Sequence, residues 1–154
     1  MELSKIIEAE SPFSGWPWRI RNPIELLKLV STFSACSHEA MLAIYVTSKL
    51  DLLSIDIVGR GSVGQVKADY REILARASQL GAGAFYLVHN HPSGNPTPSE
   101  ADVNYTRRMK RLSYELELPL LDHFIVAGSQ MRRVGTGILG EECSVWTLPE
   151  TPHG

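Results

Sequence analysis

Two apolar stretches, residues 39–47 (EAMLAIYVT) and 50–58 (LDLLSIDIV), follow one another with only a short polar junction between them. Both are rich in the large and β-branched apolar residues that are typical of buried strands. A junction as short as residues 47–49 is typical of a hairpin. These stretches therefore predict two neighbouring, buried strands that are joined as a β-hairpin.

The other regular patterns alternate between helical and extended. Asn22 suits the N-cap of a helix that begins at Pro23, and Gly81 and Gly83 suit the end of a second, amphipathic helix. We expect helices over 23–33, 67–80 and 99–117, and further strands over 85–88, 120–126 and 131–134. The order α-β-β-α-β-α-β-β predicts an α/β fold, in which a single layered domain has a mixed β-sheet flanked by helices.

Three segments lack a regular pattern. Residues 11–18 include Trp16-Pro17-Trp18 and predict an arm that lays aromatic side chains on the domain or on a partner. Residues 59–64 are rich in glycine but lack the Lys-Ser/Thr ending of a phosphate-binding loop, so we expect a plain loop. The chain after residue 135 is also expected to be irregular. This divides the chain into an N-terminal arm with the first helix (1–35), a central domain (36–135) and a C-terminal tail (136–154).

The composition limits the classes of protein to consider. Fifteen Lys and Arg against 17 Asp and Glu, a net charge of −2, do not support a strongly basic nucleic-acid binder. Cys36 and Cys143 are too far apart for a metal knuckle and too few for a disulfide scaffold. There is no signal-peptide pattern, and no apolar run approaches the roughly 20 residues of a membrane span. We expect a soluble, cytoplasmic protein without a membrane partner.

The stretch 89–102 (HNHPSGNPTPSEAD) contains most of the candidate catalytic and metal-binding residues. His89 and His91 leave the end of a strand two positions apart, so their side chains point to the same side. A proline-stiffened loop follows, and the next helix brings Asp102 back, one turn in from Ser99. Two imidazoles and one carboxylate make a three-ligand zinc site with an open position for water, which is the pattern of a catalytic site.

Each of these residues also has a plainer interpretation. Ser99 and Asp102 have the spacing of a helix-capping pair, and a single histidine such as His89 is commonly a hydrogen-bonded core residue. The joint pattern of two histidines, a serine and an aspartate at fixed spacings favours a metal site.

The spacing His-x-His-x7-Ser-x2-Asp resembles the signature of the JAMM (JAB/MPN-type) zinc metalloprotease superfamily. Together with residues 120–126 (LLDHFIV), it resembles the RadC-like JAB domain branch over about residues 36–135. The resemblance implies a JAB/MPN fold, which is cytidine-deaminase-like, and makes 36–135 the catalytic domain. It also implies Zn²⁺ held by His89, His91 and Asp102.

The resemblance extends to other residues. Glu39 stands where the family has a glutamate at the start of an early strand, and there it would act as general base and then as general acid. A surface carboxylate is the alternative for Glu39, and Asp56 is its nearest rival. Ser99 would donate a hydrogen bond to the oxyanion. His123 is interpreted either as a group that supports a metal ligand or as a structural histidine.

The implied function is hydrolysis of peptide or isopeptide bonds by a metal-activated water, with a protein or peptide, such as a ubiquitin-like conjugate, as the substrate. One alternative is a RadC-like DNA-processing or nuclease factor, which is supported by the name of the family that the chain resembles and by the basic cluster 107–111 (RRMKR). The plainer interpretation of this cluster is a solvated helix face paired with Glu115 and Glu117, so DNA is the less favoured partner. A non-catalytic JAB binding module is a third hypothesis, and the retained motif residues argue against it.

The chain also departs from the family pattern. Too few residues precede Glu39 for the helix-hairpin-helix region that RadC proteins commonly carry, and Asn95 stands where the loop more often has aspartate. A cytidine deaminase is disfavoured because the chain lacks its His-x-Glu and Pro-Cys-x-x-Cys motifs. The natural substrate and the oligomeric state stay open.

Overall fold

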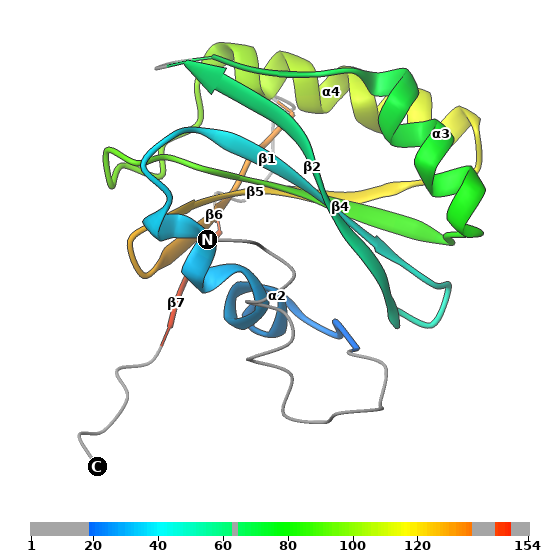
Figure 1. The fold of residues 1–154 in the computed structure, drawn as a ribbon, viewed down its shortest axis with the longest axis horizontal. Coiled ribbons are helices and arrows are strands. Elements are labelled where there is room, and N and C mark those ends of the chain that lie inside the picture. The colour runs from blue at the N-terminus through cyan, green and yellow to red at the C-terminus, as the bar shows by residue number, and fades with distance from the viewer. Residues whose placement is uncertain (1–18, 63–64, 137–143, 149–154) are drawn as a thin grey trace.

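A computed structural model of the chain describes residues 19–62, 65–136 and 144–148 (Figure 1). In this part of the chain, strands form one seven-stranded sheet in the order β3-β2-β1-β4-β5-β6-β7. The strands are β1 (Ala40–Val46), β2 (Leu52–Ser62), β3 (Gln65–Ala68), β4 (Ala84–Asn90), β5 (Leu120–Ala127), β6 (Gln130–Arg133) and β7 (Val145–Thr147). The helices are α2 (Pro23–Val30), which continues into the 3₁₀ turn η1 (Ser31–Ala35), α3 (Tyr70–Leu80) and α4 (Glu100–Glu115).

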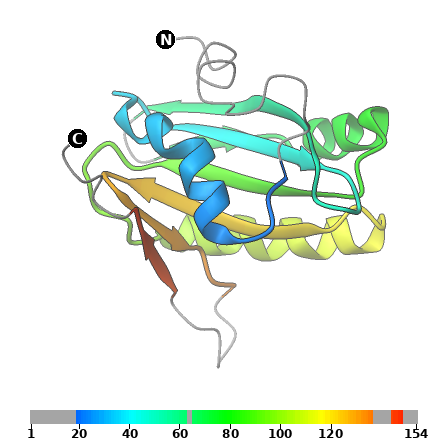
Figure 2. The same ribbon diagram turned by 90° about the horizontal axis from the view of Figure 1, so that it is seen from below.

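The sheet is sandwiched between helices. Helix α2 covers one face, and α3 and α4 cover the other (Figures 1 and 2). Every pair of neighbouring strands is antiparallel except β4 and β5, which run parallel because α4 forms the crossover between them. The predicted α/β fold, a single layered domain with a mixed sheet flanked by helices, is confirmed.

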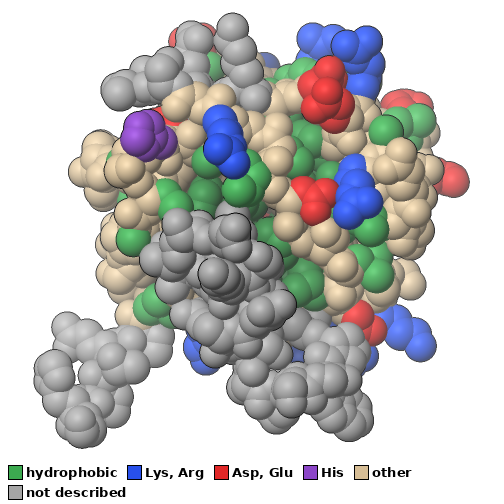
Figure 3. Space-filling view, viewed as in Figure 1, with side chains coloured by type: hydrophobic (Ala, Val, Ile, Leu, Met, Phe, Trp, Pro, Cys, Tyr) green, Lys and Arg blue, Asp and Glu red, His purple; other side chains and the backbone are tan. Residues whose placement is uncertain are grey.

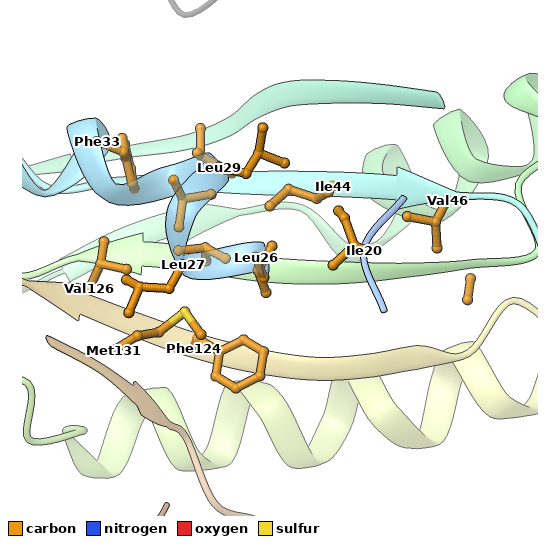
Figure 4. Packing of buried hydrophobic residues seen from close by; sticks show 14 residues of the cluster. Ile20, Leu26, Leu27, Leu29, Phe33, Ile44, Val46, Phe124, Val126 and Met131 are labelled. Carbon is orange, nitrogen blue, oxygen red and sulfur yellow. The ribbon is translucent and has the colours of Figure 1, made fainter. Parts of the chain in front are cut away.

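Both faces of the central strands are buried. Leu42 of β1 and Val88 of β4 belong to the apolar cluster under α2, whereas their chain neighbours Ala43 and Leu87 belong to the cluster under α3 and α4. Alternate side chains of a strand enter opposite faces, so a strand covered on both sides is apolar throughout. Figure 4 shows the first cluster, in which leucines of α2 pack against β1, β4 and β5.

Local signals set the helix ends. The Asn22 side chain accepts a hydrogen bond from the backbone N–H of Glu25 at 3.0 Å, with Pro23 as the first helical residue, as predicted. The first helix ends earlier than predicted, since residues 31–35 form the 3₁₀ turn. Helix α3 ends at Gly81, which adopts φ +65°, a left-handed conformation that glycine takes without steric cost.

The predicted loop is wrong over residues 59–62, and the predicted helix start at 67 is also wrong; residues 63–64 lie outside the described residues. Gly59 and Gly61 belong to β2, and residues 65–68 form β3, so α3 begins only at Tyr70, after the N-cap Asp69. Gly59 pairs with Met41 on one side and with Ala68 on the other. Pairing on both sides stabilises a strand despite the low β-propensity of glycine.

The prediction of an irregular C-terminal tail is wrong for residues 145–147, which form β7 and pair with β6. The ring of Trp146 packs edge-on against Phe124, with centroids 5.4 Å apart. At the hairpin, the second predicted strand begins only at Leu52, since Leu50 has φ +68°. The arm with Trp16, Pro17 and Trp18 lies outside the described residues. No helix in the described residues is both long and apolar enough to cross a lipid bilayer.

Candidate metal centre

The end of β4, the residue that follows it and the start of α4 bring the predicted ligands together. His89 lies at the end of this strand and His91 directly after it, while the first turn of α4 supplies Asp102. One possible ligand atom from each residue lies within 4.8 Å of the others. His89 Nε2 is 3.0 Å from His91 Nε2 and 3.4 Å from Asp102 Oδ1. His91 Nε2 is 3.7 Å from Asp102 Oδ2.

Hydrogen bonds on the far side of each imidazole decide which nitrogen carries the proton. His91 Nδ1 lies 2.8 Å from the carbonyl oxygen of Asn95. Because a carbonyl oxygen only accepts, the proton of a neutral His91 sits on Nδ1. This leaves a lone pair on Nε2, which is the atom that faces His89 and Asp102.

His89 is oriented by a longer buried chain of hydrogen bonds. Its Nδ1 is 2.8 Å from His123 Nε2, and His123 Nδ1 is 2.7 Å from Thr106 Oγ1. The Thr106 hydroxyl donates to the backbone carbonyl of Asp102 at 2.7 Å, so its oxygen must accept from His123. His123 Nε2 then accepts from His89 Nδ1–H, which leaves the lone pair of His89 on Nε2 as well.

Burial supports a neutral His123. This side chain is completely buried, and burial lowers its pKa well below the ordinary value for histidine. The neutral ring can therefore accept the hydrogen bond from His89. Of the two interpretations offered for His123, its contacts favour a group that supports His89.

The donor set fits a divalent cation. Two nitrogen lone pairs face one another at 3.0 Å, and a carboxylate lies beside them. Such an arrangement is repulsive unless a proton or a cation lies between the donors. Two imidazole nitrogens and a carboxylate oxygen match the protein ligands of catalytic zinc sites, and imidazole also suits copper, iron and nickel.

The charges of the site agree with this geometry. Burial acts to raise the pKa of the Asp102 carboxyl, but the neighbouring rings of His89 and His91 outweigh it and hold the pKa below its ordinary value. When no cation occupies the site, a proton on Nε2 of His91 can take its place beside Asp102, and this interaction, together with the charge of Glu39, raises the pKa of His91. Asp102 is therefore ionised at neutral pH and available as an anionic ligand.

Glu39 lies near enough to the three candidate ligands for its charge to raise the pKa of His91. It directly precedes β1, two residues before Met41, which pairs with His89. Its side chain therefore leaves the same face of the sheet as His89. Its rival Asp56 is engaged elsewhere, because it accepts hydrogen bonds from Arg76 at 2.9 Å and from Ser54 at 2.6 Å.

Ser99 caps α4. Its hydroxyl oxygen accepts from the backbone N–H of Asp102 at 3.0 Å, and the Asp102 carboxylate accepts from the backbone N–H of Ser99 at 2.8 Å. The capping interpretation of this pair is confirmed, and Asp102 also contacts both histidines. Capping leaves the hydroxyl hydrogen of Ser99 available to a ligand.

Two residues around the site, Thr106 and Asn90, were not predicted to support it, and the predicted pairing of the basic cluster with two glutamates is wrong. Thr106 was overlooked as the end of the chain through His123, although its place one helical turn after Asp102 could have indicated it. The side chain of Asn90, which separates the two histidines in the sequence, bonds to the backbone of the segment that carries Glu39. No ion pair in the described residues joins the basic cluster 107–111 to Glu115 or Glu117. Arg107 instead donates to the carbonyl of Thr136 at 2.7 Å.

Comparison with known proteins gives a consistent result. Residues 20–134 match the model of the RadC-like JAB domain. The chain is 33% identical over 129 residues to a UPF0758 protein of Aquifex aeolicus, which covers 82% of this chain and 56% of that protein. It is 41% identical over 93 residues to a UPF0758 protein of Bordetella petrii, covering 60% of this chain and 41% of the relative.

The chain thus spans about half the length of these curated relatives. The family match covers the whole interval from Ile20 to Val134, which includes the metal triad and Glu39. The chain belongs to the RadC-like JAB domain family, of the JAB/MPN type.

Proposed function

We propose that this protein is a zinc-dependent hydrolase of the JAMM type that cleaves peptide or isopeptide bonds. The observation that carries the proposal is the pair of imidazole Nε2 atoms, 3.0 Å apart, beside the Asp102 carboxylate, with the Nδ1 atom of each ring hydrogen-bonded on its far side. Zinc in such a site lowers the pKa of a water in the open position to about 7 and polarises a carbonyl. Membership of a JAB family supports this chemistry.

The chain's own residues supply the proton transfers and orientation. His89, His91 and Asp102 would hold the metal. The Glu39 carboxylate, whose charge acts on His91, would take a proton from the attacking water and pass it to the nitrogen of the leaving amine. The Ser99 hydroxyl, with its hydrogen not used in the cap, would donate to the oxyanion of the tetrahedral intermediate.

The first experiment measures metal content. Purified protein should contain close to one zinc per chain, and His91→Ala should contain none. His38→Ala is the matched control, because His38 is an exposed histidine whose side chain, within the described part of the chain, bonds to the neighbouring Ser37 alone. Full zinc occupancy in His91→Ala would refute the ligand set.

The second experiment separates metal binding from catalysis. Glu39→Gln should keep the zinc but lose hydrolysis of peptides and isopeptide-linked ubiquitin-like conjugates, because an amide cannot act as the base. An active Glu39→Gln protein would move the base to another residue. A zinc-loaded wild type without turnover on either substrate would favour the non-catalytic binding module.

A DNA-processing role is the second candidate. Arg107, Arg108 and Arg111 on α4 are exposed, and their cluster has no acidic partner among the described ion pairs. On the face seen in Figure 3, however, Lys and Arg side chains are interspersed with Asp and Glu. Nuclease activity that is lost in Glu39→Gln would favour this role, while activity that survives would come from another site or a contaminant.

A further inference from the structure

Asn90 stands between the two candidate ligands in the chain, but its side chain points the other way. Successive residues of a strand alternate between its two faces, so Asn90 leaves the face opposite to His89. The residue is completely buried and lies beside the segment that joins η1 to β1. A buried amide needs partners for its donors and its acceptor, because an unpaired polar group is costly in the interior.

Among the described residues, the hydrogen-bond partners of the Asn90 side chain all lie in residues 36–40. Its Oδ1 accepts from the backbone N–H of Ala40 at 2.9 Å. Its Nδ2 donates to the backbone carbonyls of His38 at 3.0 Å and Cys36 at 3.2 Å. His38 and Ala40 are the residues directly before and after Glu39, so one side chain holds the backbone on both sides of the proposed general base.

The Glu39 backbone has one further contact, with β2. Its carbonyl accepts from the N–H of Gly61 at 3.1 Å. Asn90 and Gly61 therefore hold Glu39 from the two strands that flank β1. Asn90 is the chain neighbour of both His89 and His91, so the residue that bonds to the backbone around Glu39 also lies between the two candidate histidine ligands.

We propose that Asn90 is a positioning residue that holds Glu39 in place over the metal triad. This inference rests on the proposed function. The residue touches neither metal nor substrate and acts through the backbone of residues 36–40. Precise placement matters here, because a displacement of about 1 Å at a reacting group can cost roughly 10²-fold in rate.

Two variants test the proposal. Asn90→Ala removes all three hydrogen bonds, and Asn90→Asp keeps the size and the acceptor for Ala40 but loses both donations. Ser113→Ala is the matched control, because Ser113 is also completely buried and accepts from the backbone N–H of Leu120 at 3.0 Å, in a different part of the fold. If Asn90→Ala fails to fold, Asn90→Asp decides the question.

Two measurements on the Co²⁺-loaded protein are needed. Amide exchange at Ala40 should accelerate about tenfold in Asn90→Ala, the effect of losing a hydrogen bond worth roughly 1.4 kcal/mol. The visible absorption of Co²⁺ responds to its ligands and to the groups bonded to them. Both Asn90 variants should bind Co²⁺ as tightly as wild type and shift its absorption in the direction that Glu39→Gln does, with no additional shift when combined with Glu39→Gln.

The outcomes are distinct. Faster Ala40 exchange with a wild-type Co²⁺ spectrum would show that Asn90 anchors the segment without positioning Glu39, and would overturn the proposal. A shift of equal size in Ser113→Ala would also overturn it. A wild-type protein that binds no Co²⁺ refutes the metal centre and this inference together. A protein that binds Co²⁺ but hydrolyses no peptide or isopeptide bond refutes only the hydrolase, because the spectral comparison remains valid.

Discussion

Replacing Thr106 with valine tests the hydrogen-bond chain behind the metal centre. Valine has nearly the same shape as threonine but lacks the hydroxyl, so His123 Nδ1 loses the partner that lies 2.7 Å away. If His123 keeps its proton on Nδ1, a buried donor is left unpaired. If the proton moves to Nε2 of His123, it points at the Nδ1–H group of His89. His89 must then carry its proton on Nε2, the nitrogen that faces the candidate metal site.

Either rearrangement has a predictable cost. An unsatisfied buried donor costs about 1–3 kcal/mol, and 1.4 kcal/mol corresponds to a tenfold change in an equilibrium constant. We therefore expect zinc affinity to fall by roughly 10- to 100-fold in Thr106→Val, the range typical of residues that orient metal ligands. Thr106→Ser keeps the hydroxyl and should bind zinc nearly as well as the wild type.

The measurement is a zinc titration in competition with a chromophoric chelator. The thermal unfolding of each metal-free variant is recorded beside it, so that a loss of fold is not mistaken for a loss of affinity. A folded Thr106→Val protein with wild-type zinc affinity would refute the tautomer assignment of His89 and His123.

Three further predictions concern stability. Removing the metal with a chelator should lower the melting temperature of the wild type, because a metal present at 100 times its Kd adds about 2.7 kcal/mol to the free energy of unfolding. An equal shift of the melting temperature in His91→Ala would contradict the proposed site. Gly83→Ala should lower the free energy of unfolding in urea by about 1–3 kcal/mol, because a Cβ there would lie 2.6 Å from the backbone nitrogen of Ser48; unchanged stability would be contrary to this packing. Asn22→Ala should cost about 1 kcal/mol through loss of the cap on α2, while Asn22→Asp, which keeps the acceptor, should cost less; equal losses would argue against the cap.

The three candidate metal ligands, His89, His91 and Asp102, could be predicted because their relative positions depend on residues that are close together in the sequence. The two-residue repeat of a strand places His89 and His91 on one side, and one turn of α4 places Asp102 beside its cap Ser99. All of these residues lie within a single short stretch of chain. The boundary of α2 at Asn22 was predictable for the same reason, since capping involves only neighbouring residues.

Two of the failures are at positions where distant segments meet. Gly59 and Gly61 look like a loop in isolation, and only their pairing with β1 and β3 makes them a strand. β7 exists because β6 offers it a partner. A hydrogen bond between strands depends on the whole sheet, and no local pattern of residue types encodes it.

By itself, the sequence determined the order of the layers, the start of α2, the end of α3 and the identity of the three metal-ligand candidates, because these follow from the periodicity and capping of adjacent residues. Only the tertiary structure decided that His123 and Thr106 orient His89, and that Asn90 holds the backbone around Glu39. Those contacts join residues 17 to 54 positions apart. They arise because a buried polar group must find its hydrogen-bond partner wherever the packed chain brings one within reach.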